Sequence, residues 1–299
     1  MSNVKRQTET HIDSVLGIDT WDSARILDAL AAGQERAIAS VRSAMPQIAV
    51  AADKLAARLA AGGRLAYAGA GTSIRVAVQD GSELPATFGM SEDKILYLIA
   101  GGKAAMFDTL ADAEDDVAAG QRDAAQLLAT DSLIAVAASG GTPYTVAAAE
   151  TAKAKGALVI SIVNNQNTKL GALADVEIVL DSGPEVIAGS TRMGAGTAQK
   201  AALNMLSTLT HIKLGAVHDG MMVNVQTGNA KLKQRAAGIV VQIAGVNIGQ
   251  AAAALASSQN DVKSAVLICA GAKNSGAAQS LLKETKGNLR LALAQLKHP

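Results

Sequence analysis

Short apolar runs alternate with helical patterns through the first two thirds of the chain. Between Met45 and Ala61 the apolar residues recur at helical spacing, with Ile48, Leu55 and Leu59 on one stripe. Because apolar strands that alternate with helices form right-handed crossover units, the pattern predicts a parallel sheet buried on both faces. The runs expected to be strands are 64–68, 95–99, 133–138, 157–163 and 176–180.

Helices are expected on both sides of this strand-rich region. Thr20 to Ser23 is typical of a helix start, and Gly194 to Gly215 predicts a buried helix rich in Ala and Leu. From about Gly245 the pattern changes to several short helices separated by Asn, Gly and Ser. We therefore predict a three-layer, doubly wound α/β fold with flanking helices and a small helical C-terminal domain. The expected boundaries are 1–61 for the N-terminal helices, 62–240 for the α/β domain and 241–299 for the C-terminal domain.

Composition narrows the class of protein. The 299 residues are 49% apolar but only 2% aromatic, so a large core must be packed from Ala, Val, Leu and Ile. Lys and Arg together number 27 against 26 for Asp and Glu, which argues against general nucleic-acid binding and against disorder. The single cysteine, Cys269, excludes a disulfide within the chain, and the sequence has neither a signal-peptide core in its first twenty residues nor a membrane-length apolar run. These features predict a cytoplasmic protein with no membrane or nucleic-acid partner.

Two glycine- and hydroxyl-rich loops are the first candidates for a binding site. Gly71-Thr72-Ser73 and the loop Ser139 to Thr142 each follow a predicted strand and precede a predicted helix. Ligands of doubly wound sheets bind beyond the carboxyl ends of the strands, and a helix N-terminus suits an anion. Together these features predict a phosphate-binding cradle. The alternative is a pair of ordinary helix caps, where Ser and Thr are favoured anyway.

Other ligands are less well supported. No Gly-Lys-Ser/Thr follows the glycines, and Ile74 stands where a dinucleotide fingerprint beginning at Gly69 would place its third glycine. The four histidines are scattered along the chain without metal-ligand spacing. We therefore expect neither a nicotinamide cofactor nor a metal.

Two carboxylates are candidates for acid–base chemistry. Glu83 lies in a segment, 79–89, that we expect to be a third loop, and Glu114 lies in the acidic run 112–116. Two carboxylates at one site can divide acid and base roles if their surroundings push their pKa values apart. The alternative is a solvated acidic surface, and sequence spacing alone does not bring the two residues together.

A long, ordered set of motifs carries a family resemblance from about Thr8 into the C-terminal helices. The motifs are Gly-Ala-Gly-Thr-Ser at 69–73, Asp80, Ser82-Glu83, Thr87-Phe88-Gly89, Ala113-Glu114-Asp115, Ala138-Ser139-Gly140, Thr142-Pro143-Tyr144, Glu185-Val186, Gly189-Ser190, Arg192-Met193 and Ala195 to Lys200. The pattern resembles the sugar isomerase (SIS) domain and, within that group, the N-acetylmuramic acid 6-phosphate etherases. This resemblance implies a flavodoxin-like SIS fold and a C-terminal bundle similar to a ubiquitin-associated domain.

The resemblance also implies a reaction. The family cleaves the lactyl ether of N-acetylmuramic acid 6-phosphate to N-acetylglucosamine 6-phosphate and D-lactate by elimination and hydration, in amino sugar catabolism and cell-wall recycling. Residues matching Glu83 and Glu114 are taken as the acid and the base, without a cofactor, in homodimers whose sites are completed across the interface. We expect substrate contacts from Gly71, Thr72, Ser73, Ser82, Ser139, Gly140, Thr142, Ser190, Thr191 and Arg192.

Two departures from the family pattern leave other functions open. Gly141 and Gly194 stand where the family has Arg and Lys, so two cations are missing near the expected site. The substrate's lactyl carboxylate then lacks an evident partner, which leaves room for a changed substrate. The alternatives are an SIS-domain aldose–ketose isomerase, and a non-catalytic regulator that binds a sugar phosphate.

Overall fold

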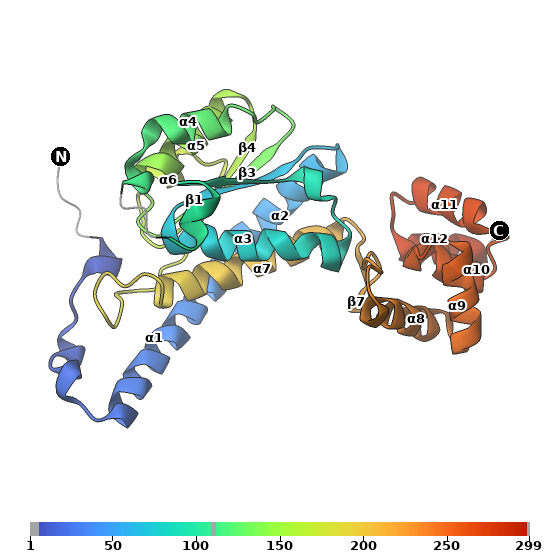
Figure 1. Cartoon of the computed structure of the whole chain (residues 1–299), viewed down its shortest axis with the longest axis horizontal. Helices are drawn as coiled ribbons and strands as arrows, with labels where there is room; N and C mark the ends of the chain where they lie inside the picture. Colours follow the sequence, from blue (N-terminus) through green and yellow to red (C-terminus); the bar gives the residue numbers. More distant parts are fainter. Residues whose placement is uncertain (1–5, 109–111, 298–299) are drawn as a thin grey trace. The chain divides into compact units, whose positions relative to one another are not determined.

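The computed structural model describes residues 6–108 and 112–297 and contains a five-stranded parallel sheet (Figure 1). The strand order is β2-β1-β3-β4-β5, and every pairing in this sheet is parallel. All five predicted strands are confirmed to within about two residues at each end. Their bounds are Leu65–Gly69 for β1, Ile95–Ile99 for β2, Ser132–Ala137 for β3, Leu158–Val163 for β4 and Val176–Val179 for β5.

The sheet is covered on both faces, as the predicted three-layer fold requires. Ala66 and Ala68 of β1 face one apolar cluster, which includes residues of α4, α5 and α6. Tyr67, which points to the opposite face, contacts α3. Figure 1 shows α2, α3 and α7 on that second face. The helices of the two layers are α4 Val117–Ala124, α5 Pro143–Ala154 and α6 Lys169–Leu173, and α2 Met45–Ala60, α3 Gly71–Phe88 and α7 Gly194–Lys213.

The expected third loop at 79–89 is wrong, because α3 runs without a break from Gly71 to Phe88. Gly81 and Pro85 resemble turn residues in the sequence, but both lie inside the helix. Position 81 requires glycine because its neighbours leave no room for a side chain. A Cβ there would lie 2.8 Å from the Tyr67 ring and 2.8 Å from the Tyr97 hydroxyl. The helix also begins earlier than predicted, so that Thr72 and Ser73 lie in its first turn.

The predicted first helix is present as α1, Ser23–Ser43, and its N-cap is Asp22, which accepts a hydrogen bond from the Arg25 N–H. Only Ala37, Ser40 and Val41 of this helix are buried, and Leu27 in its first turns is 65% exposed. Short 3-10 helices precede α1 and connect later elements. They are η1 Gln7–Glu9, η2 Asp13–Val15, η3 Ile18–Thr20, η4 Glu92–Lys94, η5 Lys103–Met106 and η6 Ala113–Asp115.

The chain divides into two compact units. The first contains the residues up to Gly81 together with Asp93–Ser207, and the second contains Ser82–Glu92 and the chain from Thr208 onward. The second unit has an apolar cluster that includes Val240 and Val266. It contains the short helices expected after Gly245, while the predicted domains 1–61, 62–240 and 241–299 stay a prediction. The elements of this unit beyond α7 are β6 Val217–His218, β7 Met221–Met222, α8 Ala230–Ala244, α9 Ile248–Ser257, α10 Val262–Cys269, α11 Ser275–Glu284 and α12 Leu289–Lys297.

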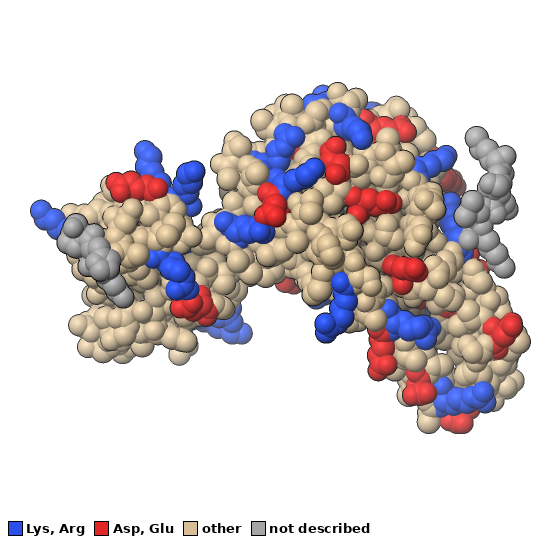
Figure 2. Space-filling view, turned by 180° about the vertical axis from the view of Figure 1, so that it is seen from behind, with Lys and Arg blue, Asp and Glu red and all other residues tan. Residues whose placement is uncertain are grey.

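Across residues 6–108 and 112–297, no single helix has the length and apolar character needed to cross a membrane. The helices α8 and α9, bent by 111° where they meet, would pass that test only as a pair, by length and composition. On the face shown in Figure 2, Lys and Arg side chains are interspersed with Asp and Glu.

Candidate functional site

The two hydroxyl-rich loops lie at the point where the order of the sheet reverses. From β1 the chain first adds β2 on one side, and it then crosses over to add β3 on the other side of β1. Gly69 at the end of β1 pairs with Val136 near the end of β3, so the loops that follow these strands are neighbours. In doubly wound sheets the crevice at such a reversal is where ligands bind.

The first loop is short and leads directly into α3. A Cβ on Gly69 would lie 2.8 Å from the Val136 carbonyl oxygen, so this position requires glycine. Gly71 has a φ of +52°, and Ser73 is buried in the first helical turn beside half-buried Thr72. The N–H groups of this turn have no partner four residues earlier within the helix, and they carry partial positive charge. The turn therefore offers backbone donors and two hydroxyls to an anion.

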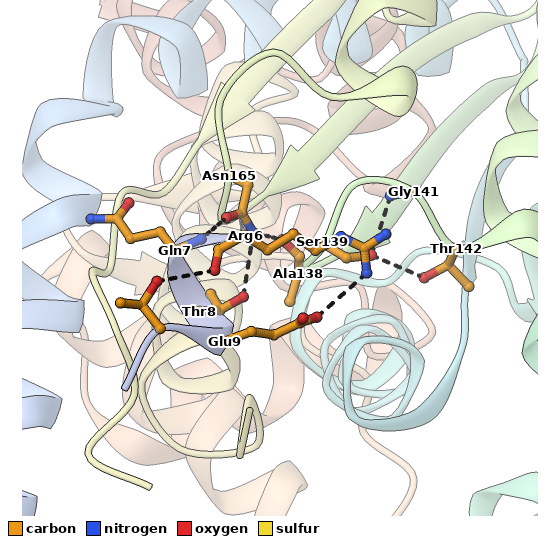
Figure 3. A network of polar contacts seen from close by, with 10 residues as sticks. Arg6, Gln7, Thr8, Glu9, Ala138, Ser139, Gly141, Thr142 and Asn165 are labelled. Carbon is orange, nitrogen blue, oxygen red and sulfur yellow. Dashed lines mark hydrogen bonds and ion pairs between the residues drawn. The ribbon is translucent and has the colours of Figure 1, made fainter. Parts of the chain in front are cut away.

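The second loop holds its hydroxyls close together (Figure 3). The Gly141 N–H donates to Ser139 Oγ at 3.2 Å, and the Ser139 and Thr142 hydroxyl oxygens lie 3.5 Å apart. Thr142 is the N-cap of α5 but makes no side-chain capping hydrogen bond. The ordinary-cap explanation therefore fails for Thr142, whose hydroxyl faces the loop.

Gly140 gives this loop its shape. It has a φ of +61°, which a residue with a side chain rarely adopts. A Cβ there would also lie 2.4 Å from the Thr168 side chain. The position therefore requires glycine on both conformational and steric grounds.

A third segment, Ser190 to Arg192, was also expected to contact the substrate and lies just before α7. A Cβ on Gly196 would lie 3.1 Å from the Thr72 methyl and 3.2 Å from the Thr191 carbonyl oxygen, which places both threonines next to Gly196. Ser190 and Thr191 are half-buried, and Arg192 is exposed. The structure thus brings the first loop and the third segment together.

The N-terminus of α7 is already occupied by a carboxylate of the chain. Buried Glu185 accepts hydrogen bonds from the Gly194 and Ala195 N–H groups, both at 2.9 Å. A carboxylate in this place satisfies the free N–H groups and complements the helix dipole. This helix end is therefore closed to a substrate anion.

The two glutamates lie on different elements, α3 and η6. Both Glu83 and Glu114 are exposed. Glu83 lies on α3 twelve residues after Gly71. Ser82, the residue before it, is also exposed. Glu114 lies on η6, which packs against α5.

A buried polar network, for which the sequence suggested no role, fixes α3 below the cradle. Asp80 accepts hydrogen bonds from the Tyr67 hydroxyl at 2.8 Å, from Asn204 Nδ2 at 2.6 Å and from Ser207 Oγ at 2.8 Å. Burial, with the adjacent Asp80 carboxylate, raises the pKa of Tyr67 well above its ordinary value, so its hydroxyl remains a donor. The network joins β1, α3 and α7 and holds the first turn of α3 at the sheet.

The N-terminal segment is a part of the site region that sequence reasoning missed. The Gln7 N–H donates to Asn165 Oδ1 at 2.9 Å, and Asn165 Nδ2 donates to the Ala138 carbonyl at 2.8 Å (Figure 3). The Gly189 N–H donates to the Thr8 carbonyl at 3.1 Å. The segment therefore contacts residues next to both the second loop and the third segment.

Among the residues that the structure describes, no group of three or more His, Cys, Asp or Glu side chains is placed to hold a metal ion.

Comparison with known families and proteins places the chain among sugar-phosphate proteins. Residues 108–209 match the SIS domain, and residues 47–153 match the glucokinase regulatory protein N-terminal SIS domain. Three similar curated proteins are N-acetylmuramic acid 6-phosphate etherases. The Streptomyces avermitilis protein is 43% identical over 93% of this chain and 89% of its own length. The proteins of Deinococcus radiodurans and Vibrio cholerae are 40% and 41% identical, over 99% and 96% of this chain and 97% of each relative.

Proposed function

Because the chain belongs to the N-acetylmuramic acid 6-phosphate etherase family, we propose that it is a carbon–oxygen lyase acting on N-acetylmuramic acid 6-phosphate. The products are N-acetylglucosamine 6-phosphate and D-lactate. The observation that carries this proposal is the pair of hydroxyl-lined loops at the ends of the neighbouring strands β1 and β3. These loops present hydroxyl donors and the N–H groups at the start of a helix, and both kinds of donor bind phosphate oxygens.

The cradle divides into three contributions. The first turn of α3 supplies N–H groups and the hydroxyls of Thr72 and Ser73, and the second loop supplies those of Ser139 and Thr142. The segment Ser190 to Arg192, which lies beside Thr72, holds the sugar hydroxyls. The substrate is thereby oriented by neutral donors from three segments that are far apart in sequence.

The reaction is an elimination followed by a hydration. In the open-chain sugar the aldehyde at C1 acidifies the C2 proton, and Glu114 removes that proton. As the C2–C3 double bond forms, the C3–O bond breaks and Glu83 protonates the departing lactate oxygen. Water then adds at C3 and a proton returns to C2. Each positioned acid or base contributes about 100- to 10,000-fold to the rate.

A homodimer completes this site, as the family resemblance implies. In this dimer Glu83, which lies on α3 beyond its first turn, acts at the cradle of a second copy. The first three turns of α1, with Leu27 65% exposed, and Ile38 further along, 45% exposed, offer an unpartnered apolar surface for that copy. The dimer is part of the proposal.

A second candidate function is that of a non-catalytic sugar-phosphate sensor. The match of residues 47–153 to the glucokinase regulatory protein N-terminal SIS domain favours it, as does the exposure of both glutamates. Such a protein would bind the sugar phosphate at the same loops and leave it unchanged.

Incubation with N-acetylmuramic acid 6-phosphate separates these functions. Equal amounts of D-lactate and N-acetylglucosamine 6-phosphate are expected if the protein is an etherase. Tight binding with intact substrate would instead assign the sensor function, and an isomerised product without lactate would assign an isomerase.

We place the reaction in the cytoplasm, within amino sugar catabolism and cell-wall recycling. The single, unpaired Cys269 supports a reducing compartment. Fractionation of cells that make the protein tests this location, and recovery outside the cytoplasm would contradict it.

A further inference from the structure

The guanidinium of Arg6 lies directly over the second loop. A Cβ built on Gly141 would lie 3.2 Å from Arg6 Nη2, closer than side-chain atoms normally approach. In Figure 3 the Arg6 side chain extends from the N-terminal segment toward Gly141. A cation from the beginning of the chain therefore occupies the space beside Gly141, where this loop has no charged side chain of its own.

Hydrogen bonds hold the backbone next to Arg6 to two other segments of the chain. Gln7 bonds Asn165, which also bonds the carbonyl of Ala138, the residue just before the second loop. Thr8 is 1% exposed, and its carbonyl accepts the Gly189 N–H. These anchors hold the segment to the unit that carries the cradle, so the position of Arg6 is set by the fold.

Most of the guanidinium's hydrogen-bonding capacity is still available. Its ion pair is with Glu9, at 3.5 Å, and the two side chains are 48% and 56% exposed. An exposed pair at this separation is weak, and the guanidinium carries five N–H donors in a planar fork. That fork matches the oxygens of a phosphate, and an anion with two negative charges can displace the single carboxylate of Glu9.

We propose that Arg6 binds the substrate's phosphate at the second loop, as the cation that position 141 lacks. This inference rests on the proposed function, because it assumes that the second loop holds a sugar phosphate. Arg6 is a specificity-determining residue in this account: it selects phosphorylated sugars and takes no part in the proton transfers.

Calorimetric titration of the full-length chain with N-acetylglucosamine 6-phosphate tests the proposal. This ligand has the phosphate but no lactyl carboxylate. Arg6→Ala is expected to weaken binding about 10- to 100-fold, which is the loss of a charge-assisted hydrogen-bonded pair. Arg6→Lys should lie in between, because an ammonium lacks the fork. Arg42→Ala, which removes an exposed arginine near the end of α1, is the matched control and should bind as the wild type does.

A second variant tests whether Arg6→Ala weakens binding because the guanidinium is lost or because the N-terminal segment is disturbed. The backbone of Gly141 is not left-handed, and the one neighbour that a Cβ there would meet is Arg6 itself. The double variant Arg6→Ala/Gly141→Arg supplies a guanidinium from the loop itself. We expect it to recover most of the affinity for N-acetylglucosamine 6-phosphate that Arg6→Ala loses. If the single Arg6→Ala variant, shown to be folded by circular dichroism, binds N-acetylglucosamine 6-phosphate as tightly as the wild type, the inference is overturned.

The remaining outcomes keep the two proposals apart. If the wild type releases lactate while Arg6→Ala binds normally, the function stands and the role of Arg6 does not. Weakened binding by Arg6→Ala in a protein that never releases lactate leaves Arg6 at the phosphate and removes the etherase activity. If the wild type binds no sugar phosphate, both proposals are wrong.

Discussion

The Tyr67 hydroxyl donates to Asp80 at 2.8 Å, and this buried bond joins β1 to α3, the helix whose first turn we propose to bind phosphate. Tyr67 is fully buried, and Asp80 is 4% exposed. The bond therefore lies where water cannot replace it, and it holds α3 against β1.

Tyr67→Phe is expected to lower the free energy of unfolding by about 1–3 kcal/mol, because Asp80 Oδ2 loses its donor inside the core. Denaturant unfolding measures this loss. Asp80→Ala should cost more, since it also removes the hydrogen bonds that Asn204 Nδ2 and Ser207 Oγ donate to this carboxylate. Equal stability of Tyr67→Phe and the wild type would mean that the bond does not support the fold.

Gly140→Ala should damage the second loop. The new Cβ would meet the Thr168 side chain at 2.4 Å, and alanine rarely adopts the φ of +61° found there. We expect N-acetylglucosamine 6-phosphate to bind at least about tenfold more weakly, since sites are sensitive to displacements of about 1 Å. Gly183→Ala is the matched control: its φ of +72° imposes similar backbone strain, but nothing lies within 4 Å of its Cβ. Equal binding by both variants would show that the shape of the loop does not matter.

Asp131 predicts how stability responds to acid. Burial acts to raise its pKa, but hydrogen bonds from Arg64 and from the Leu128 N–H outweigh burial and hold the pKa below its ordinary value. A carboxylate with a lowered folded-state pKa stabilises the fold above its unfolded pKa, and this contribution is lost as the pH falls through the folded value.

Asp131→Asn should therefore reduce stability near neutral pH and flatten its decline between about pH 5 and pH 2. Urea unfolding at a series of pH values measures both effects. An acid profile parallel to that of the wild type would contradict the role given to Asp131.

Much of the fold can be predicted because its signals are local. The runs that became β1, β3 and β4 are buried at every position, and such strands read as continuous apolar segments. The helix α8 was not predicted, although Asn229 caps it in the ordinary way and marks its start in the sequence.

The rest depends on contacts between distant residues. In the sequence Gly81 resembles a turn residue. In the structure the stacked Tyr67 and Tyr97 rings, whose centroids lie 6.0 Å apart, leave no room for a Cβ at position 81. The N-terminal segment is anchored through Asn165 and through backbone groups, which leave no periodic pattern. The position of Glu83 followed only from the continuity of α3, which the sequence pattern had appeared to interrupt.

The shared site predicts complementation between two inactive variants. Glu83→Gln lacks the acid, and a Ser139→Ala/Thr142→Val variant lacks the cradle hydroxyls. If Glu83 acts at the cradle of a second copy, a mixed dimer contains one intact site, so co-expression should restore lactate release that neither variant gives alone. Activity that stays absent in purified mixed dimers would show that one copy supplies both the acid and the cradle.

Release of D-lactate from N-acetylmuramic acid 6-phosphate, by the wild type and by Glu83→Gln, tests the central claim most directly. We expect one lactate for each N-acetylglucosamine 6-phosphate from the wild type, and release at least about 100-fold slower from the variant. Binding of N-acetylglucosamine 6-phosphate should be unchanged in Glu83→Gln, which separates the loss of the acid from a loss of the site. No lactate from the wild type, or release by Glu83→Gln at the wild-type rate, would contradict it.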